Sequence, residues 1–300
     1  MKKYRVYQVD SFTKQKFRGN PAGVVSNAEG LNEEQMLQIA RELNNSETAF
    51  IFPSDSPDYD VEVRFFTPTI EVPICGHATI AAHYIYAKER NAPSGRVLQK
   101  TKAGILPVDI LRQNDDYVMM MTQGKPEVSV PLSDEIRHRI ADGLNIAESD
   151  IRRDCPIAIA STGHSKVMVP IYSNDTLHSL QPNMQKLAAL SQEIGCNGYY
   201  VFTLNPQDDV LVHGRMFAPA IGISEDPVTG NANGPLGAYL VHYNLYQDEN
   251  SPYFDFDILQ GEAIKRDGTM HVHVEKQNGK PVLVQITGEA VVAFETEIEI

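Results

Sequence analysis

The sequence predicts an α+β fold in which two similar β-barrel-like halves each wrap around a central helix. The first observation behind this prediction is an internal repeat. The segment 64–78, RFFTPTIEVPICGHA, resembles the segment 215–232, RMFAPAIGISEDPVTGNA. The second observation is that each copy runs into a helix that is apolar nearly all round, which is typical of a helix buried on every side. The third is a succession of short strands after each helix.

The repeat extends beyond that block. The segment 36–52 resembles 186–202, and the pair Leu98-Gln99 resembles Leu259-Gln260. Both halves keep the order helix, strand, F-x-P strand, G-x-A helix and β-meander. A period of about 150 residues is the size of a domain rather than of a solenoid repeat. Gene duplication is the simplest account.

The domain boundaries follow from the repeat. We expect an N-terminal half at 1–125, to which a strand at 290–300 can return, and a C-terminal half at 126–289, with 126–131 as the linker. Unequal polar groups stand at matching points of the two copies. An active site in the cleft between the halves is therefore predicted.

Local patterns place the elements of the first half in order. Residues 4–9 alternate as a strand does. Asn32 caps a helix, with Gln35 three residues later to close a capping box, and Asn44-Asn45 ends it. Further strands are expected at 48–52, 61–66, 97–101, 105–111 and 117–122, with the central helix at 78–87. The second half repeats this order, with its own buried helix at 232–243 and Pro235 in the first turn, where proline is tolerated.

Composition sets the outer bounds. The chain has 300 residues, enough for two domains with full cores, and its 42% hydrophobic and 22% charged residues are globular values. A net charge of −13 argues against nucleic acid or an anionic membrane as partner. Neither a signal peptide nor an apolar run of membrane-spanning length is evident.

The cysteines are three in number and give no disulfide framework, which favours a cytoplasmic protein: Cys75, Cys155 and Cys196. The chain contains no Cys-x-x-Cys, His-Glu-x-x-His or Gly-x-Gly-x-x-Gly motif, so we expect no metal and no cofactor. His271 and His273 share one face of a strand, but no third ligand is evident and they are assigned no role.

The two G-x-A helix starts are candidate anion sites. The first turn of a helix presents unpaired N–H groups and a partial positive charge, and glycine lets a ligand approach the backbone. Gly76, Gly230 and Asn231 are therefore expected to bind a substrate carboxylate. Alone, each glycine could serve only to make a tight turn; as a matched pair they favour binding.

Glu47 is the candidate general base. It lies at a helix-to-strand corner followed by Thr48-Ala49-Phe50, and its counterpart in the second half is Asn197, so only one half carries an acid there. A carboxylate in apolar surroundings suits proton abstraction from carbon. The alternative is an ordinary surface glutamate at a helix end, and only the neighbouring residues outweigh it.

Three more residues accompany these. Asp226 lies in the segment inserted into the second copy and is a candidate for binding substrate or tuning Glu47, or it is a plain turn carboxylate. His77 is a candidate proton shuttle or substrate donor, or a helix-capping histidine. Cys75 could be a reactive thiolate at a helix start, but the interpretation as a small buried residue is favoured.

These segments resemble the phenazine-biosynthesis PhzF-like isomerase family over essentially the whole chain. The resemblance rests on four stretches, 9–25, 44–52 (NNSETAFIF), 65–82 (FFTPTIEVPICGHATIAA) and 222–234 (GISEDPVTGNANG). It implies the diaminopimelate-epimerase-like fold, two similar barrel halves with the site between them. It also implies a homodimer.

The resemblance implies cofactor-independent proton transfer as well. In the phenazine branch a glutamate takes a proton from one ring carbon of a dihydro-hydroxyanthranilate and delivers it to another. Glu47 in S-E-T matches that glutamate, while His77 in C-G-H-A and Asp226 in E-D-P-V-T-G match the assisting residues. The sequence departs at Asn231 and Asn233, where the family commonly reads Ser-Ala-His.

Three hypotheses follow. The first is an isomerase that moves a proton between carbons of a small carboxylate-bearing substrate, with Glu47 as general acid and base. The second is an amino-acid racemase or epimerase that uses Cys75; the related racemases pair two cysteines, whereas here the matching positions are Cys75 and Thr229. The third is a metabolite-binding scaffold without turnover.

Overall fold

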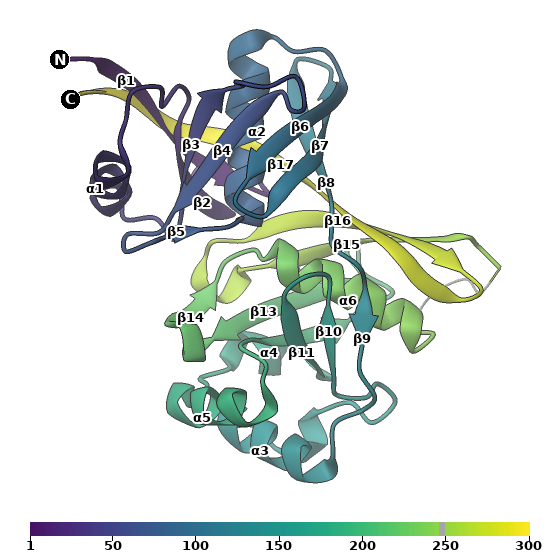
Figure 1. Cartoon of the computed structure of the whole chain (residues 1–300). Helices are drawn as coiled ribbons and strands as arrows, with labels where there is room; N and C mark the ends of the chain where they lie inside the picture. Colours follow the sequence, from purple (N-terminus) through teal and green to yellow (C-terminus); the bar gives the residue numbers. More distant parts are fainter. Residues whose placement is uncertain (246–249) are drawn as a thin grey trace. The chain divides into compact units, whose positions relative to one another are not determined.

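The computed structural model describes residues 1–245 and 250–300, which form two compact units. Unit 1 comprises Met1–Thr122 with Thr287–Ile300, and unit 2 comprises Gln123–Ile286. Strands predominate in both, and helices are few (Figure 1). Within these residues no helix combines the length and the apolar character that a membrane span requires.

Unit 1 is built from eight strands of its own and one that ends in it. Its elements are β1 (Lys3–Ser11), β2 (Asn20–Val25), α1 (Glu33–Leu43), β3 (Thr48–Pro53), β4 (Val61–Phe66), β5 (Glu71–Val72), α2 (Gly76–Arg90), β6 (Gly95–Thr101), β7 (Gly104–Gln113), β8 (Asp116–Thr122) and the end of β17 (Lys280–Glu299).

Eight of these strands close into a barrel. The pairs run β1–β2, β2–β3, β3–β4, β4–β6, β6–β7, β7–β8, β8–β17 and β17–β1. The pairs β2–β3 and β4–β6 are parallel, and each needs a crossover, which α1 and α2 provide. Closure leaves the barrel without a free sheet edge.

The helix α2 is the buried centre of unit 1. It contacts β1, β2, β3, β7 and β8, and Ile80, Tyr84 and Ile85 on it are fully buried. Each such side chain contributes roughly 1.5–3 kcal/mol through burial. The predicted central helix is confirmed, and it begins two residues earlier than the pattern suggested, at Gly76.

The helix α1 lies on the outside of the barrel. Its predicted capping box is confirmed, since the side chain of Asn32 accepts from the N–H of Gln35 and the side chain of Gln35 accepts from the N–H of Asn32. Met36 and Ile39 face a core that includes Phe50. Asn44 ends the helix in the left-handed conformation, with φ 52°.

Unit 2 carries more helix. Its elements are β9 (Glu127–Val128), α3 (Asp134–Leu144), the 3-10 turn η1 (Glu148–Asp150), β10 (Ala158–Ser161), β11 (Ser165–Pro170), α4 (Asn174–Ser179), α5 (Met184–Ile194), β12 (Tyr199–Leu204), β13 (Val212–Ala218), η2 (Pro219–Ile221), β14 (Ile223–Asp226), α6 (Gly230–His242), β15 (Tyr253–Gln260), η3 (Glu262–Ile264) and β16 (Gly268–Gln277).

The strands of unit 2 follow a similar order of pairing. The β11–β12 pair is parallel, β12–β13 antiparallel, β13–β15 parallel and β15–β16 antiparallel. The buried helix α6 contacts β9, β10, β11, β15 and β16. The segment 126–131, expected as a linker, contains β9, which pairs with β10.

An arginine in the same position braces the F-x-P strand of each unit. In β4, Arg64 makes two 2.7 Å bonds to the carboxylate of Glu71 and lies over the ring of Phe66. In β13, Arg215 bonds the carboxylate of Glu225 at 2.9 and 2.7 Å and lies over Phe217. Bidentate pairs of this kind combine charge with fixed geometry.

Candidate active site

Glu47 is held by the corner between α1 and β3. Its carbonyl oxygen accepts from the N–H of Gly23 in β2 at 3.3 Å. A Cβ at Gly23 would come 2.6 Å from Leu43 Cδ1 and 2.8 Å from Thr48 Oγ1, so the corner packs where only glycine fits. Just before Glu47, the amide of Asn45 exchanges two hydrogen bonds with an amide on β1. The backbone that carries the carboxylate is therefore fixed.

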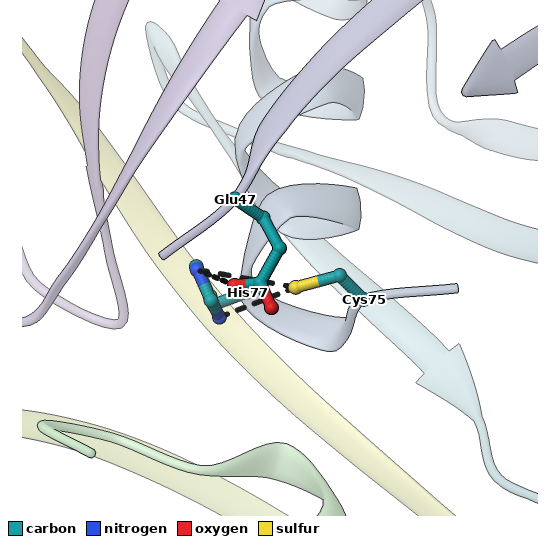
Figure 2. A group of neighbouring side chains, drawn as sticks. All are labelled: Glu47, Cys75 and His77. Carbon is teal, nitrogen blue, oxygen red and sulfur yellow. Dashed lines mark hydrogen bonds and ion pairs between the residues drawn. The ribbon is translucent and has the colours of Figure 1, made fainter. Parts of the chain in front are cut away.

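His77 lies in the first turn of α2 and points at this corner. Its Nε2 lies 3.3 Å from Glu47 Oε2 (Figure 2). The same nitrogen lies 3.3 Å from Ser46 Oγ. The two side chains are largely shielded, with 8% of His77 and 19% of Glu47 exposed. The hydroxyl of Ser11 donates to the carbonyl of His77 at 2.8 Å and holds that turn from β1.

Cys75 completes the cluster. Its Sγ lies 3.4 Å from His77 Nδ1, and the residue is only 9% exposed (Figure 2). A carboxylate only accepts hydrogen bonds, so a proton on His77 Nε2 is the one that satisfies the contact with Glu47. Nδ1 then offers its lone pair to the Cys75 thiol. The order thiol, imidazole, carboxylate is that of a proton relay.

The start of α2 is open above this cluster. In the part of the chain that the structure describes, the N–H groups of Gly76, His77 and Ala78 have no hydrogen-bond partner. A Cβ placed on Gly76 would meet nothing within 4 Å. Free N–H groups with the positive end of the helix beside them favour an anion.

The corresponding region of unit 2 is built around Asp226 and Thr229. The Thr229 hydroxyl donates to the Asp226 carboxylate. Gln260 joins both: its Nε2 donates to the Asp226 carbonyl at 2.8 Å and to Thr229 Oγ1 at 3.0 Å, and its Oε1 accepts from the Thr229 N–H at 3.1 Å. Asn233 donates to the same Oε1 at 2.9 Å. We call these four hydrogen-bonded residues, Asp226, Thr229, Asn233 and Gln260, the polar knot. Their hydrogen bonds fix the turn into α6.

Gly230 and Asn231 occupy the first turn of α6. Neither N–H group has a partner among the described residues. A Cβ on Gly230, however, would approach Ile286 Cδ1 to 2.5 Å. Close packing against Ile286 is therefore by itself a reason for glycine at position 230, whereas packing gives no such reason at Gly76. The substrate-binding roles of both glycines and of Asn231 stay predictions.

The sequence singles out Glu47 and His77, which the structure brings within 3.3 Å of each other, but it does not indicate all of their surroundings. Ser46 was not singled out, although it directly precedes Glu47. Cys75 was favoured as an inert buried residue, and the structure places it both in the core and against the imidazole. Gln260 was noticed only as a repeat match with Gln99. Its role at the turn into α6 depends on a long-range strand contact that no local pattern reveals.

The side chains of the cluster are close enough together to be ligands of one metal ion. The ligand atoms of Glu47, Cys75 and His77 all lie within 4.8 Å of one another. Among the described residues, the other two cysteines belong to no such group of metal-ligand side chains. Cys155 and Cys196 are buried and form no disulfide, and burial raises the pKa of the Cys155 thiol to about 11.

The chain is similar to known proteins over nearly its whole length. Residues 9–296 match the family model PhzC-PhzF, described as phenazine biosynthesis-like protein. An uncharacterized isomerase of Clostridium acetobutylicum is 58% identical over 299 residues, with 99% of both chains covered. The uncharacterized isomerase YddE of Escherichia coli K12 is 48% identical, with 98% of both covered. A PhzF-family phenazine biosynthesis protein of Bacillus anthracis has a solved structure with TM-score 0.89, 32% identity and full coverage of both chains.

A barrel with a buried helix, together with relatives named as isomerases, defines the class: the chain is an enzyme of the isomerase type. The chain belongs to the phenazine biosynthesis-like PhzC-PhzF family, and the resemblance drawn from its motifs is confirmed.

Proposed function

We propose that the protein is a cofactor-independent isomerase that moves a proton between two carbons of a small carboxylate-bearing substrate. Glu47 takes the proton from one carbon as a base and returns it to another as an acid, so atoms and charge balance within one turnover. His77 holds the carboxylate in place through Nε2. Asp226 assists, and Gly76, Gly230 and Asn231 bind the substrate.

The observation that carries the proposal is the 3.3 Å contact between Glu47 Oε2 and His77 Nε2 at an open helix start. A base for a carbon acid must be fixed, shielded and near donors for the negative charge that develops. Glu47 is anchored by its backbone, is 19% exposed, and contacts the side chain of His77, in a helix turn whose first three N–H groups have no partner among the described residues. This partial burial supports the proposal over the alternative of an ordinary surface glutamate.

The decisive experiment replaces the acid alone. Glu47→Gln keeps the shape and removes the proton acceptor. We expect incorporation of solvent deuterium into substrate to fall by roughly 10²–10⁴-fold while substrate binding is retained. The first probe is a dihydro-hydroxyanthranilate, by resemblance to the family, followed by a panel of cyclic amino acids and unsaturated carboxylates in D₂O, read by NMR.

Asn197→Ala is the matched control for that experiment. Asn197 holds the corresponding place in unit 2 and is exposed. Deuterium incorporation should match that of the unchanged protein. An exchange rate in Glu47→Gln equal to that of the control would remove Glu47 from the mechanism.

The racemase or epimerase alternative has one observation in its favour, the 3.4 Å contact between Cys75 Sγ and His77 Nδ1. In that reaction the thiol, deprotonated by the imidazole, exchanges a proton at a single carbon. Cys75→Ala separates the two chemistries. Turnover is lost if Cys75 is a base and persists if Glu47 alone moves the proton. Binding to the whole panel with no exchange in the unchanged protein would instead favour the non-catalytic scaffold.

Duplication of an ancestral half also belongs to the proposal. It is supported by the matched pairs Arg64–Glu71 and Arg215–Glu225 and by the similar order of parallel and antiparallel pairs in the two units. The homodimer implied by the family resemblance and the cytoplasmic location expected from composition stay predictions.

A further inference from the structure

A second polar cluster lies in unit 2, on residues that the proposed reaction does not use. It consists of His178 in α4, His213 in β13 and Glu262 in η3. Glu262 Oε2 lies 2.8 Å from His213 Nδ1 and 3.2 Å from His178 Nε2. The three ligand atoms lie within 4.8 Å of one another. The spacing along the sequence matches no metal motif, so only the fold brings them together.

Each residue of the cluster is positioned by contacts outside it. Arg215, locked to Glu225, also donates to the carbonyls of Leu177 at 2.9 Å and Leu180 at 3.1 Å, which fixes α4 on either side of His178. Glu262 follows Gly261, whose φ of 91° turns the chain at the end of β15. His213 is part of β13. The ligand atoms are therefore preorganised, as a binding site requires.

The buried nitrogen of His213 points to a ligand. His213 is 9% exposed, and its Nε2 is sealed from solvent without a hydrogen-bond partner among the described residues. A carboxylate oxygen of Asp208 faces it at 3.8 Å. If the ring proton sits on Nδ1 and is donated to Glu262, a bare lone pair on Nε2 faces that carboxylate. A cation on Nδ1 moves the proton to Nε2 and turns this repulsion into attraction.

That arrangement is common in metal sites. A histidine that binds a metal through one ring nitrogen usually donates the other N–H to a carboxylate, which fixes the ring. Here Asp208 would be the outer carboxylate. Two imidazole nitrogens and one carboxylate oxygen suit zinc, cobalt and nickel, and three protein ligands leave a position for water.

We propose that His178, His213 and Glu262 bind one divalent transition-metal ion, with Asp208 orienting His213. The three ligands come from elements about 35 and 50 residues apart in the chain, so the ion ties α4, β13 and η3 together. Its effect is on the stability of unit 2. Nothing in the proposed proton transfer depends on it.

The test uses the full-length, tag-free protein, stripped of metal with a chelator. Titration with CoCl₂ should give one equivalent with the visible absorption of a low-symmetry site, and ZnCl₂ in excess should raise the Tm by about 5 °C. His178→Ala and Glu262→Gln should each weaken Co²⁺ binding at least about tenfold. Because His178 is partly exposed, we expect the His178→Ala variant to fold, and circular dichroism of that variant checks this. Glu262→Gln is the second variant and is nearly isosteric.

The control removes the competing surface histidines. His271 and His273 both lie near Asp255 on the β15–β16 pair, at 3.4 and 2.6 Å, and the double variant His271→Ala/His273→Ala should bind Co²⁺ unchanged. Loss of binding in this double variant, retention in both cluster variants, or no saturable binding in the unchanged protein would each overturn the proposal and leave a hydrogen-bonded cluster only.

Discussion

The starts of α2 and α6 occupy matching places in the two units and are built in opposite ways. In unit 1 the turn before the helix is bare: Cys75 makes no capping bond, and the space above Gly76 is open. In unit 2 the turn is filled. Gln260 makes hydrogen bonds to both the N–H and the hydroxyl of Thr229, and Ile286 packs so close to Gly230 that a Cβ there would clash with it. The same helix geometry is thus left open in unit 1 and packed in unit 2.

Part of the frame has stayed alike. Thr79 donates to the carbonyl of Cys75 at 2.7 Å, and Asn233 donates to that of Thr229 at 3.0 Å, four residues into each helix. What differs is the set of side chains that surround the free N–H groups. The backbone of the two helix starts is alike, but the polar side chains around them differ. A similar backbone therefore does not imply a similar function for the two helix starts.

The largest expected effect concerns acid stability. His83 is a fully buried residue of α2, and burial lowers its pKa to about 4 from an ordinary 6.5. The corresponding position of α6 is Gly237. Between those pH values the unfolded chain binds a proton that the folded unit 1 does not, so its free energy of unfolding falls as the pH drops, by about 3 kcal/mol in all.

Hydrogen exchange at pH 7 and pH 5, corrected for intrinsic rates, measures this difference. Protection of α2 should fall more than protection of α6. His83→Gln keeps a donor for Gln99 and removes the titration, so the extra acid sensitivity of α2 should vanish. Equal losses in α2 and α6 of the unchanged protein would contradict the prediction.

The next effect compares the two matched glutamines. Gln260→Leu strands the N–H of Thr229 and removes one of the two hydrogen bonds donated by the Asn233 amide, whereas Gln99→Leu strands only the His83 ring nitrogen that contacts Gln99 at 3.1 Å. Each buried polar group without a partner costs about 1–3 kcal/mol. Urea unfolding should show a loss of about 3 kcal/mol for Gln260→Leu and about half of that for Gln99→Leu. The reverse ranking would mean that the polar knot is not what holds α6.

The smallest effect tests the two glycines directly. Gly230→Ala should cost about 1–2 kcal/mol of stability through overpacking against Ile286, and Ile286→Val in the same protein should relieve it. Gly76→Ala should unfold like the unchanged protein, but its methyl group would cover the free N–H groups and lower kcat/KM about tenfold. If Gly76→Ala turned over normally, the open helix start would have no part in binding.

Local signals in the sequence were reliable where a short stretch decides the structure. The Asn32–Gln35 capping box and the all-apolar core of α2 follow from neighbours a few residues apart. The proximity of Glu47 to His77 followed from the repeat and the family motifs. The contact of Cys75 with the imidazole did not, because it depends on how two side chains turn within one helical turn.

Long-range clusters escaped sequence reasoning for a different reason. Asp255 was not recognised as a partner of His271 and His273 because it lies opposite His273 only through the register of β15 with β16. His178, His213 and Glu262 meet through three separate elements. No periodicity links such residues, so only the packed chain reveals them.

The pairing of β1 with the end of β17 has a consequence for synthesis of the protein. Lys3 pairs with Glu299, so β1 waits for a strand that is synthesised nearly 300 residues later. While the chain emerges from the ribosome, β1 and β8 present unpaired edges, and unit 2 is available in full before unit 1 can close. The barrel of unit 1 is therefore the part of the molecule that closes last during synthesis.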